Sequence, residues 1–301
     1  MEIDARTSFN YINQKALSSM QSSKSSITTL AKQITSGKYA DTYTDLVEKT
    51  PVESLLNMKQ IHTSLNLRNK SNKLLSGKVS EIENALRHLS EDIIKDSTTL
   101  CMHAKDPATG PSLDILSLSR NKLEQIRGVL NASFNGEKLF AGSKIKVTDV
   151  VGDIALFSNI VSGKITANYY NGDTDKFSAK ISDTHTLQYG VTADNPAFTN
   201  LIAAHHYMIN NDFDNAITAL HTAKQDLGDL VAKIGEHSKA ISQQVSNDDS
   251  NLLRLSESVT NIEDVDVTEL MPQLAMLEVQ LKASFMLTTQ LSDLSLVNFL
   301  R

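Results

Sequence analysis

The chain has 301 residues, and its 40% hydrophobic content is enough to build one or more folded domains. Aromatic residues make up only 5%, Trp is absent, and Gly and Pro are few, a composition typical of long helices rather than sheet cores. The net charge of -6, without a segment that gathers Lys and Arg, argues against a nucleic-acid partner. The single cysteine, Cys101, excludes an internal disulfide framework.

No stretch approaches the roughly 20 consecutive apolar residues that a membrane-spanning helix needs, so no membrane partner is expected. The first residues mix Glu2, Asp4 and Arg6 with apolar side chains and lack the apolar core of a cleavable signal peptide. The sequence therefore predicts a cytoplasmic protein, unless export uses a route that needs no such signal.

A first helix is expected over about Thr7 to Ser36, with a seam of small residues that lets a partner helix approach closely. Gly37 fits its C-cap. A second helix is expected from Pro51 to about Ala104, and a third over about Leu113 to Ser133. The turn signal between them, Asp106 to Ser112, predicts an antiparallel pair.

Glycines then break the chain into short runs, which predicts a small β-rich insertion that ends at Pro196 to Phe198. Within it, Asn171-Gly172-Asp173 is expected to form a hairpin turn. A short helix around Asn200 to Ile209 follows. Apolar residues next alternate at four- and three-residue spacing from Leu220 to Ile262, the pattern of a long helix that packs along a partner helix. The last helix is expected to begin near Val267.

We therefore predict a mainly α protein: a long antiparallel coiled-coil helical rod with its N- and C-terminal helices paired, plus a small β-rich insertion. The expected segments are a terminal-helix arm at 1–44, the first half of the rod at 45–135, the insertion at 136–198, the second half of the rod at 199–262 and a terminal-helix arm at 263–301.

Two groups of residues are predicted to carry the packing of this rod. The rod core is expected to consist of Leu75, Val79, Ile82, Leu86, Leu89, Ile93, Leu227, Val231, Ile234, Ile241, Val245, Leu252, Leu255 and Val259. The final helix is almost uncharged and apolar on more than one face, so it needs more than one neighbour. The predicted subunit interface on the terminal helices is Phe9, Ile12, Leu17, Met20, Ile27, Leu30, Leu274, Leu277, Leu281, Phe285, Leu287, Leu291, Leu294 and Leu300.

Catalytic, cofactor and metal sites are not expected. His205, His206 and His221 suggest a metal site, but adjacent helical residues point in different directions, so ordinary surface or interface histidines are the better interpretation. Asn171, Asp173 and Asp175 resemble the start of a calcium loop, but Lys176 stands where that loop needs Gly. No catalytic constellation is present, so the chain is not expected to be an enzyme.

Three segments resemble the bacterial flagellin family, which comprises filament flagellins and hook-filament junction proteins (hook-associated protein 3). ITSGKYAD at 34–41 is similar to the end of the family's first helix, and FNGEKLFAGSK at 134–144 to the segment after its third helix. NIEDVDVTELMPQLAMLEVQLKASFMLTTQLSDLSLVNFL at 261–300 resembles the C-terminal signature. The Phe140-Ala141-Gly142 segment and the small insertion are more similar to the junction branch.

The resemblance implies a structural component of the flagellum that connects the hook to the filament, exported without a cleaved signal peptide and therefore extracellular. The partners it implies are other copies of the chain, an adjoining hook-associated protein, filament flagellin and an export chaperone. Two alternatives remain: filament flagellin, and more remotely a soluble coiled-coil adaptor or a secreted effector.

Overall fold

The computed structural model describes residues 2–40, 42, 52–144, 147–155, 160–161, 164–165 and 169–299, with only the backbone described for 2–10, 160–161, 164–165 and 291–299. Contacts divide the chain into two compact units. The first comprises residues 1–63 and 251–301, and the second comprises residues 64–250.

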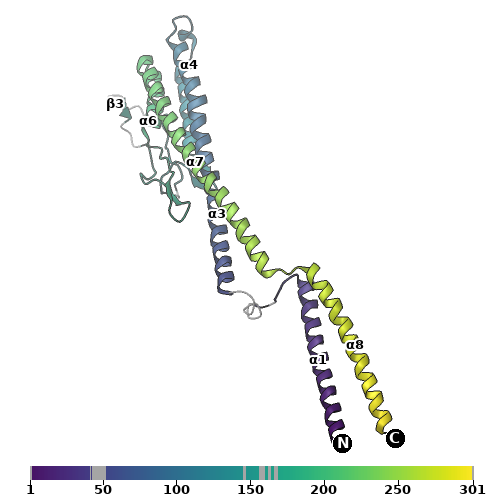
Figure 1. Cartoon of the computed structure of the whole chain (residues 1–301). Helices are drawn as coiled ribbons and strands as arrows, with labels where there is room; N and C mark the ends of the chain where they lie inside the picture. The colour runs from purple at the N-terminus through teal and green to yellow at the C-terminus, as the bar shows by residue number, and fades with distance from the viewer. Residues whose placement is uncertain are drawn as a thin grey trace. The chain divides into compact units, whose positions relative to one another are not determined.

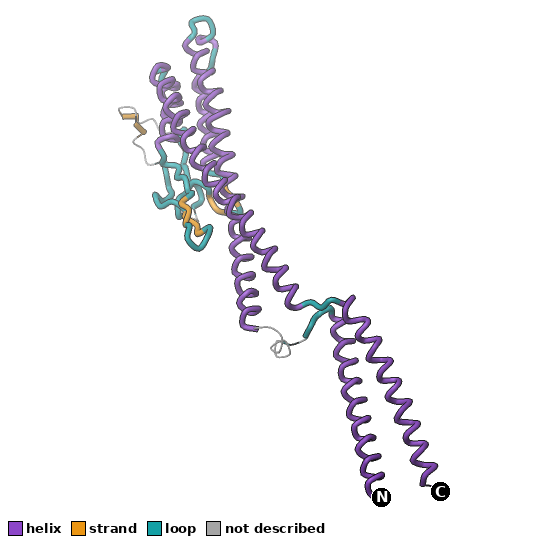
Figure 2. Tube along the Cα trace, viewed as in Figure 1, coloured by secondary structure: helices purple, strands orange, loops and turns teal. Residues whose placement is uncertain are grey.

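Helices account for most of the described chain (Figures 1 and 2). In chain order they are α1 (Glu2–Ser36), α3 (Val52–Arg87), the π-helical turn η1 (His88–Ile93), α4 (Ile94–Lys105), the 3₁₀ turn η2 (Gly110–Ser112), α5 (Ile115–Leu130), α6 (Pro196–Ile209), α7 (Phe213–Glu263) and α8 (Val267–Phe299). The strands are β1 (Ser133–Phe134), β2 (Glu137–Lys138), β3 (Ile160–Val161), β4 (Lys164–Ile165), β5 (Ser178–Lys180) and β6 (Thr186–Gln188).

In the first unit, α1 and α8 lie side by side in antiparallel orientation, with the two ends of the chain at the same end of the pair (Figure 1). Their Cα atoms approach within 8 Å, as the small residues of α1 allow. Gly37 ends α1 with a φ of 69°, which confirms the predicted C-cap. The expected start of the last helix at Val267 is also confirmed. There, the Asp266 carboxylate accepts a hydrogen bond from the Thr268 amide at 2.8 Å.

α3 begins in the first unit and continues into the second, where the π-helical turn η1 joins it to α4 in one long helix. The buried positions step by four and three through α3 and η1, from Leu75 to Ile93, and then resume one residue later, at Ile94, Ser97 and Cys101. A π-helical turn takes up one extra residue, so both halves of the helix keep their apolar stripe toward the core. The stepping pattern had indicated an uninterrupted helix to about Ala104.

The hairpin of α4 and α5 is completed by α6 and by the start of α7. α5 begins after Asp114, whose carboxylate accepts from the Ser117 amide at 3.1 Å, and α6 begins after Asn195, which accepts from the Ala197 amide at 3.0 Å. Most of α6 is buried, because helices and the insertion cover it from several sides. The core of the unit lies here.

The insertion contains three two-stranded antiparallel pairings among its described residues: β1 with β2, β3 with β4, and β5 with β6. The hairpin predicted at Asn171-Gly172-Asp173 is wrong. Tyr170 pairs with Val151, and the Asp173 amide donates to the Ala141 carbonyl at 2.9 Å, so this segment is a loop held by other parts of the insertion. The hairpin turn lies instead at Asn135 and Gly136, both with positive φ, as a type I′ turn requires.

The Phe140-Ala141-Gly142 segment fixes the insertion to the helices. Phe140 is fully buried and meets Phe198 of α6 edge to face, with ring centroids 5.7 Å apart. Gly142 has a φ of 68°, and a Cβ atom there would collide with the Asp173 carbonyl. This segment is therefore required by packing in the fold.

The two adjacent histidines are core residues, which corrects the expectation of surface or interface positions. His205 is fully buried, and its Nε2 lies 3.1 Å from the Ser97 Oγ. The Ser97 hydroxyl already donates to the Ile93 carbonyl, so the imidazole is the donor in this pair. His206 is also buried and donates from Nε2 to the Ile154 carbonyl at 2.9 Å. His221 is exposed.

Burial lowers the pKa of His205 from 6.5 to about 3. Below pH 6.5 the unfolded chain therefore takes up a proton that the folded chain does not. The free energy of unfolding decreases as the pH is lowered from about 6.5 to about 3.

We predict that His205→Gln removes about 1.4 kcal/mol per pH unit from the slope of the unfolding free energy against pH, between about pH 6 and 4. Urea unfolding at a series of pH values measures this slope, and the exposed His221→Gln is the control. An unchanged slope in His205→Gln would contradict the prediction.

Candidate assembly interface

The surface between α1 and α8 has a narrow apolar centre. Of the α1 side chains described, Met20 and Ser23 are buried, while Ile27 and Leu30 are half-buried. The Thr288 Oγ1 of α8 lies 3.6 Å from the Met20 sulfur. On α8, the half-buried residues toward α1 include Leu274, Leu277 and Leu281. Pairing therefore covers one side of each helix only.

Large apolar side chains on the other sides of the two helices remain exposed. On α8, Met276 is 74% exposed and Leu287 is 60% exposed. The exposed apolar residues of the pair are Tyr11, Ile12, Leu17, Val267, Met271, Met276, Val279, Phe285, Met286 and Leu287. Over residues 267–290, the charged side chains of α8 are Glu269, Glu278 and Lys282. Such a surface is typical of an interaction site.

The predicted interface residues fall into three groups. Met20, Ile27, Leu30, Leu274, Leu277 and Leu281 lie between α1 and α8, whereas Ile12, Leu17, Phe285 and Leu287 are exposed. For Phe9, Leu291 and Leu294 only the backbone is described, and Leu300 lies outside the described residues. One part of the set therefore pairs the helices within the chain, and another part is free to contact neighbours.

The predicted rod core is buried along α3 and along the first part of α7. Buried members are Leu75, Val79, Ile82, Leu86, Leu89, Ile93, Leu227, Ile234 and Ile241; half-buried members are Val231, Val245, Leu252, Leu255 and Val259. On α7 the last buried position is Asp248, seven residues after Ile241. A charged residue thus stands where the apolar stripe would place another Leu or Ile.

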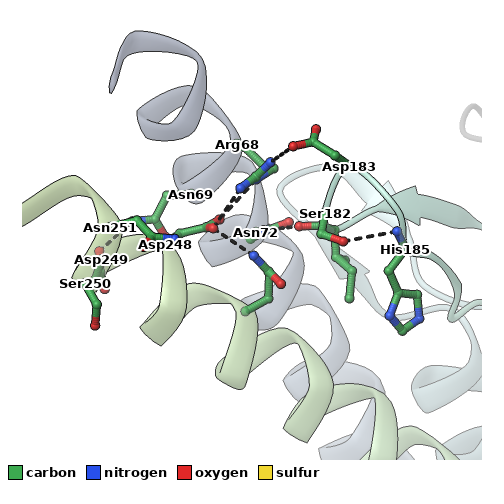
Figure 3. Close-up of polar contacts among 12 residues, drawn as sticks. Arg68, Asn69, Asn72, Ser182, Asp183, His185, Asp248, Asp249, Ser250 and Asn251 are labelled. Atoms are coloured by element: carbon green, nitrogen blue, oxygen red, sulfur yellow. Dashed lines mark hydrogen bonds and ion pairs between the residues drawn. The ribbon is translucent and has the colours of Figure 1, made fainter. Parts of the chain in front are cut away.

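Asp248 is held by Arg68 of α3, an arrangement that the sequence did not suggest (Figure 3). The Arg68 guanidinium donates to Asp248 from Nη2 at 2.9 Å and from Nε at 3.2 Å, and from Nη1 to Asp183 at 3.0 Å. Gln244 also donates to Asp248 at 2.8 Å. The bonds of Arg68 to Asp248 and Asp183, chiefly that to Asp248, raise the pKa of the guanidinium.

Neighbouring polar side chains of α3 extend this layer in two directions. Asn69 and Lys73 donate to the Asp249 carboxylate at 2.5 and 3.0 Å, and these bonds lower the pKa of Asp249. On the insertion side, the Asn72 amide donates to the Ile181 carbonyl at 2.9 Å. Together with Arg68, these residues join α3 to α7 and to the loop between β5 and β6.

Two protein-family models match this chain. The model described as the bacterial flagellin N-terminal helical region matches residues 7–145, and the model described as the C-terminal helical region matches residues 211–300. The chain belongs to the bacterial flagellin family. It is a structural component of the flagellum, of the flagellin and hook-associated type, and the insertion lies mainly between the two matched regions.

Two solved structures are similar to this chain, and the first has the same fold. A flagellar hook-associated protein from Vibrio parahaemolyticus matches with a TM-score of 0.54 and 16% sequence identity, over 71% of this chain and 99% of that one. The crystal structure of Bacillus cereus FlgL aligns with a TM-score of 0.42 and 14% identity, over 70% and 95% of the two chains. A comparison with curated proteins gives no match.

The described residues give no indication of a membrane or metal site. None of the helices, as far as they are described, is long and apolar enough to cross a bilayer. Within the same residues, no group of three or more His, Cys, Asp or Glu side chains could hold a metal ion. Proteins of the flagellin family act as structural subunits rather than as enzymes.

We predict that Asp248→Ala lowers the free energy of unfolding by about 3 kcal/mol, because it leaves the Arg68 guanidinium without its buried partner. Asp183→Ala, at a side chain that is 85% exposed, is the matched control and should cost at most about 1 kcal/mol. Urea unfolding followed by circular dichroism measures both. Equal losses in the two variants would show that burial of Asp248 is not decisive.

Proposed function

We propose that this flagellin-family chain is the hook-filament junction protein of a bacterial flagellum, an extracellular subunit that joins the hook to the filament. The observation that carries an assembly role is the exposed apolar surface of α1 and α8, which the chain does not cover itself. Two features favour the junction branch. The insertion is small, and the Vibrio structure that matches over 99% of its own length is described as a flagellar hook-associated protein.

The proposed partners follow from this role. Other copies of the chain would cover the exposed faces of the terminal helices in a head-to-tail arrangement, in which each patch meets a different patch on its neighbour. An adjoining hook-associated protein would contact one end of this layer of subunits, and filament flagellin would contact the other end. Because α8 has exposed apolar residues on several sides, it would be fully buried only in the assembly.

Filament flagellin is the second candidate, since both family models also describe flagellins. The Phe140-Ala141-Gly142 segment is weak evidence for either branch, because packing against Phe198 and Asp173 requires Phe140 and Gly142 in this fold. The assembly behaviour of the chain therefore distinguishes them. An adaptor or effector function has no supporting observation.

Immunogold labelling of isolated flagella tests the junction role directly. We expect a single band of label beside the hook, and we expect cells that lack the protein to make hooks and release flagellin into the medium. Label along the whole shaft, or growth of long filaments from the purified subunit alone in salt, would establish the flagellin alternative. Retention of the chain inside cells that export other flagellar proteins would contradict both roles.

We further propose that an export chaperone covers α8 before assembly, because its exposed Met and Leu side chains would otherwise promote aggregation. A chain that ends before Val267 should lose binding to the chaperone. Replacement of the exposed residues Met276, Met286 and Leu287 by Gln should weaken this binding by at least about tenfold, as expected for three apolar contacts. Isothermal titration measures both, and the matched control is Leu67→Gln, an exposed apolar residue of α3. Unchanged affinity in the triple variant would contradict this proposal.

A further inference from the structure

Backbone hydrogen bonds join the two short non-helical segments that border the terminal helices. The segment after α1 and the segment between α7 and α8 run antiparallel, and Lys38 bridges with Asp264. The Tyr39 amide donates to the Glu263 carbonyl at 2.8 Å, and the Val265 amide donates to the Gly37 carbonyl at 3.1 Å. All of these residues belong to the first unit. The chain therefore leaves α1 and enters α8 through one bonded pair of segments.

The Glu263 side chain adds charge to this pairing. Its carboxylate forms an ion pair with Lys59 of α3, and its second oxygen lies 3.8 Å from the Lys38 Nζ. The Glu263 side chain is only 16% exposed, so water screens these pairs less than at an open surface. From α1, the Gln33 amide donates to the Tyr39 carbonyl at 2.7 Å. We call this set of seven residues the clasp: Gln33, Gly37, Lys38, Tyr39, Lys59, Glu263 and Val265.

The helix pair that the clasp borders has little packing of its own. No α8 side chain between residues 267 and 290 is fully buried, and Met20 and Ser23 are the buried α1 residues among those described. Helices with so little buried apolar area are marginal in water. The alignment of α1 and α8 in the free subunit therefore depends on the clasp, which joins the end of α1 to the start of α8.

We propose that the clasp, centred on the Glu263 carboxylate, holds α1 and α8 paired and aligned in the free subunit, so that their exposed apolar faces are presented together to neighbouring subunits. The inference rests on the assembly role proposed for the terminal helices, in the junction protein and in flagellin alike. It assigns Glu263 a positioning role.

Hydrogen exchange of the full-length free subunit, resolved by mass spectrometry, tests the inference. Glu263→Gln keeps the size of the side chain and the backbone bonds but removes the charge. The matched control is Glu257→Gln, six residues earlier on the exposed side of α7. We expect amides in residues 11–36 and 268–290 of Glu263→Gln to exchange roughly tenfold faster than in the parent chain, as loss of two partly buried ion pairs allows. Residues 75–101 and the control should be unchanged.

Salt provides a second measurement that a general loss of folding would not reproduce. About 1 M NaCl screens charge pairs and should speed exchange of the same two segments in the parent chain while leaving Glu263→Gln unaffected. Exchange in Glu263→Gln at the rate of the parent chain would overturn the inference, as would faster exchange that includes residues 75–101. Neither measurement requires assembly, so a negative immunogold result would not affect their outcome.

Discussion

The pairing of Arg68 with Asp248 limits how far the tight packing of α3 against α7 extends. In the first part of α7, every seventh residue is buried from Leu220 through Leu227 and Ile234 to Ile241, and Ala216 and Ala223 are buried as well. At Asp248 the same stripe carries a carboxylate that must be bonded, because a buried charge without a partner is costly. Beyond it, the apolar residues of α7 are half-buried. The polar layer thus stands where the buried stripe of α7 ends.

The helices could be predicted from the sequence because their signals are local and repeated. Apolar spacing indicated the long helices, Gly37 the end of the first helix, and the pattern after NIEDVD the start at Val267. Pro196 was expected to close the insertion, but it is the first residue of α6, four residues before the expected start near Asn200. The position of the insertion could be predicted, but its strands could not. Strands of two or three residues are too short to show the alternation of apolar and polar residues. Asn171-Gly172 has the composition of a turn, yet the Ala141 carbonyl and the Tyr170 hydroxyl hold that segment as a loop.

The candidate site was partly predictable for a related reason. Periodicity identifies which residues face a neighbouring helix, but it does not tell whether that helix belongs to the same chain. Thus Met20 and Leu274 each lie between α1 and α8 of the same subunit, while Leu17 and Leu287 remain exposed. The bonds of Arg68 to Asp183 and Asp248 join residues 115 and 180 positions apart, which no local pattern relates. The available signal was an acidic residue at a core position of the seven-residue repeat.

The π-helical turn has a consequence for how this helix can change in length. A regular helix rotates by about 100° per residue, so one added residue would normally turn every later side chain away from its partners. Here η1 absorbs the extra residue, and Ile94, Ser97 and Cys101 still reach the core. The long helix can therefore lose a single residue at this turn, and become a regular α-helix there, without a change in the spacing of either end. Deletions in the rod need not come in sets of seven.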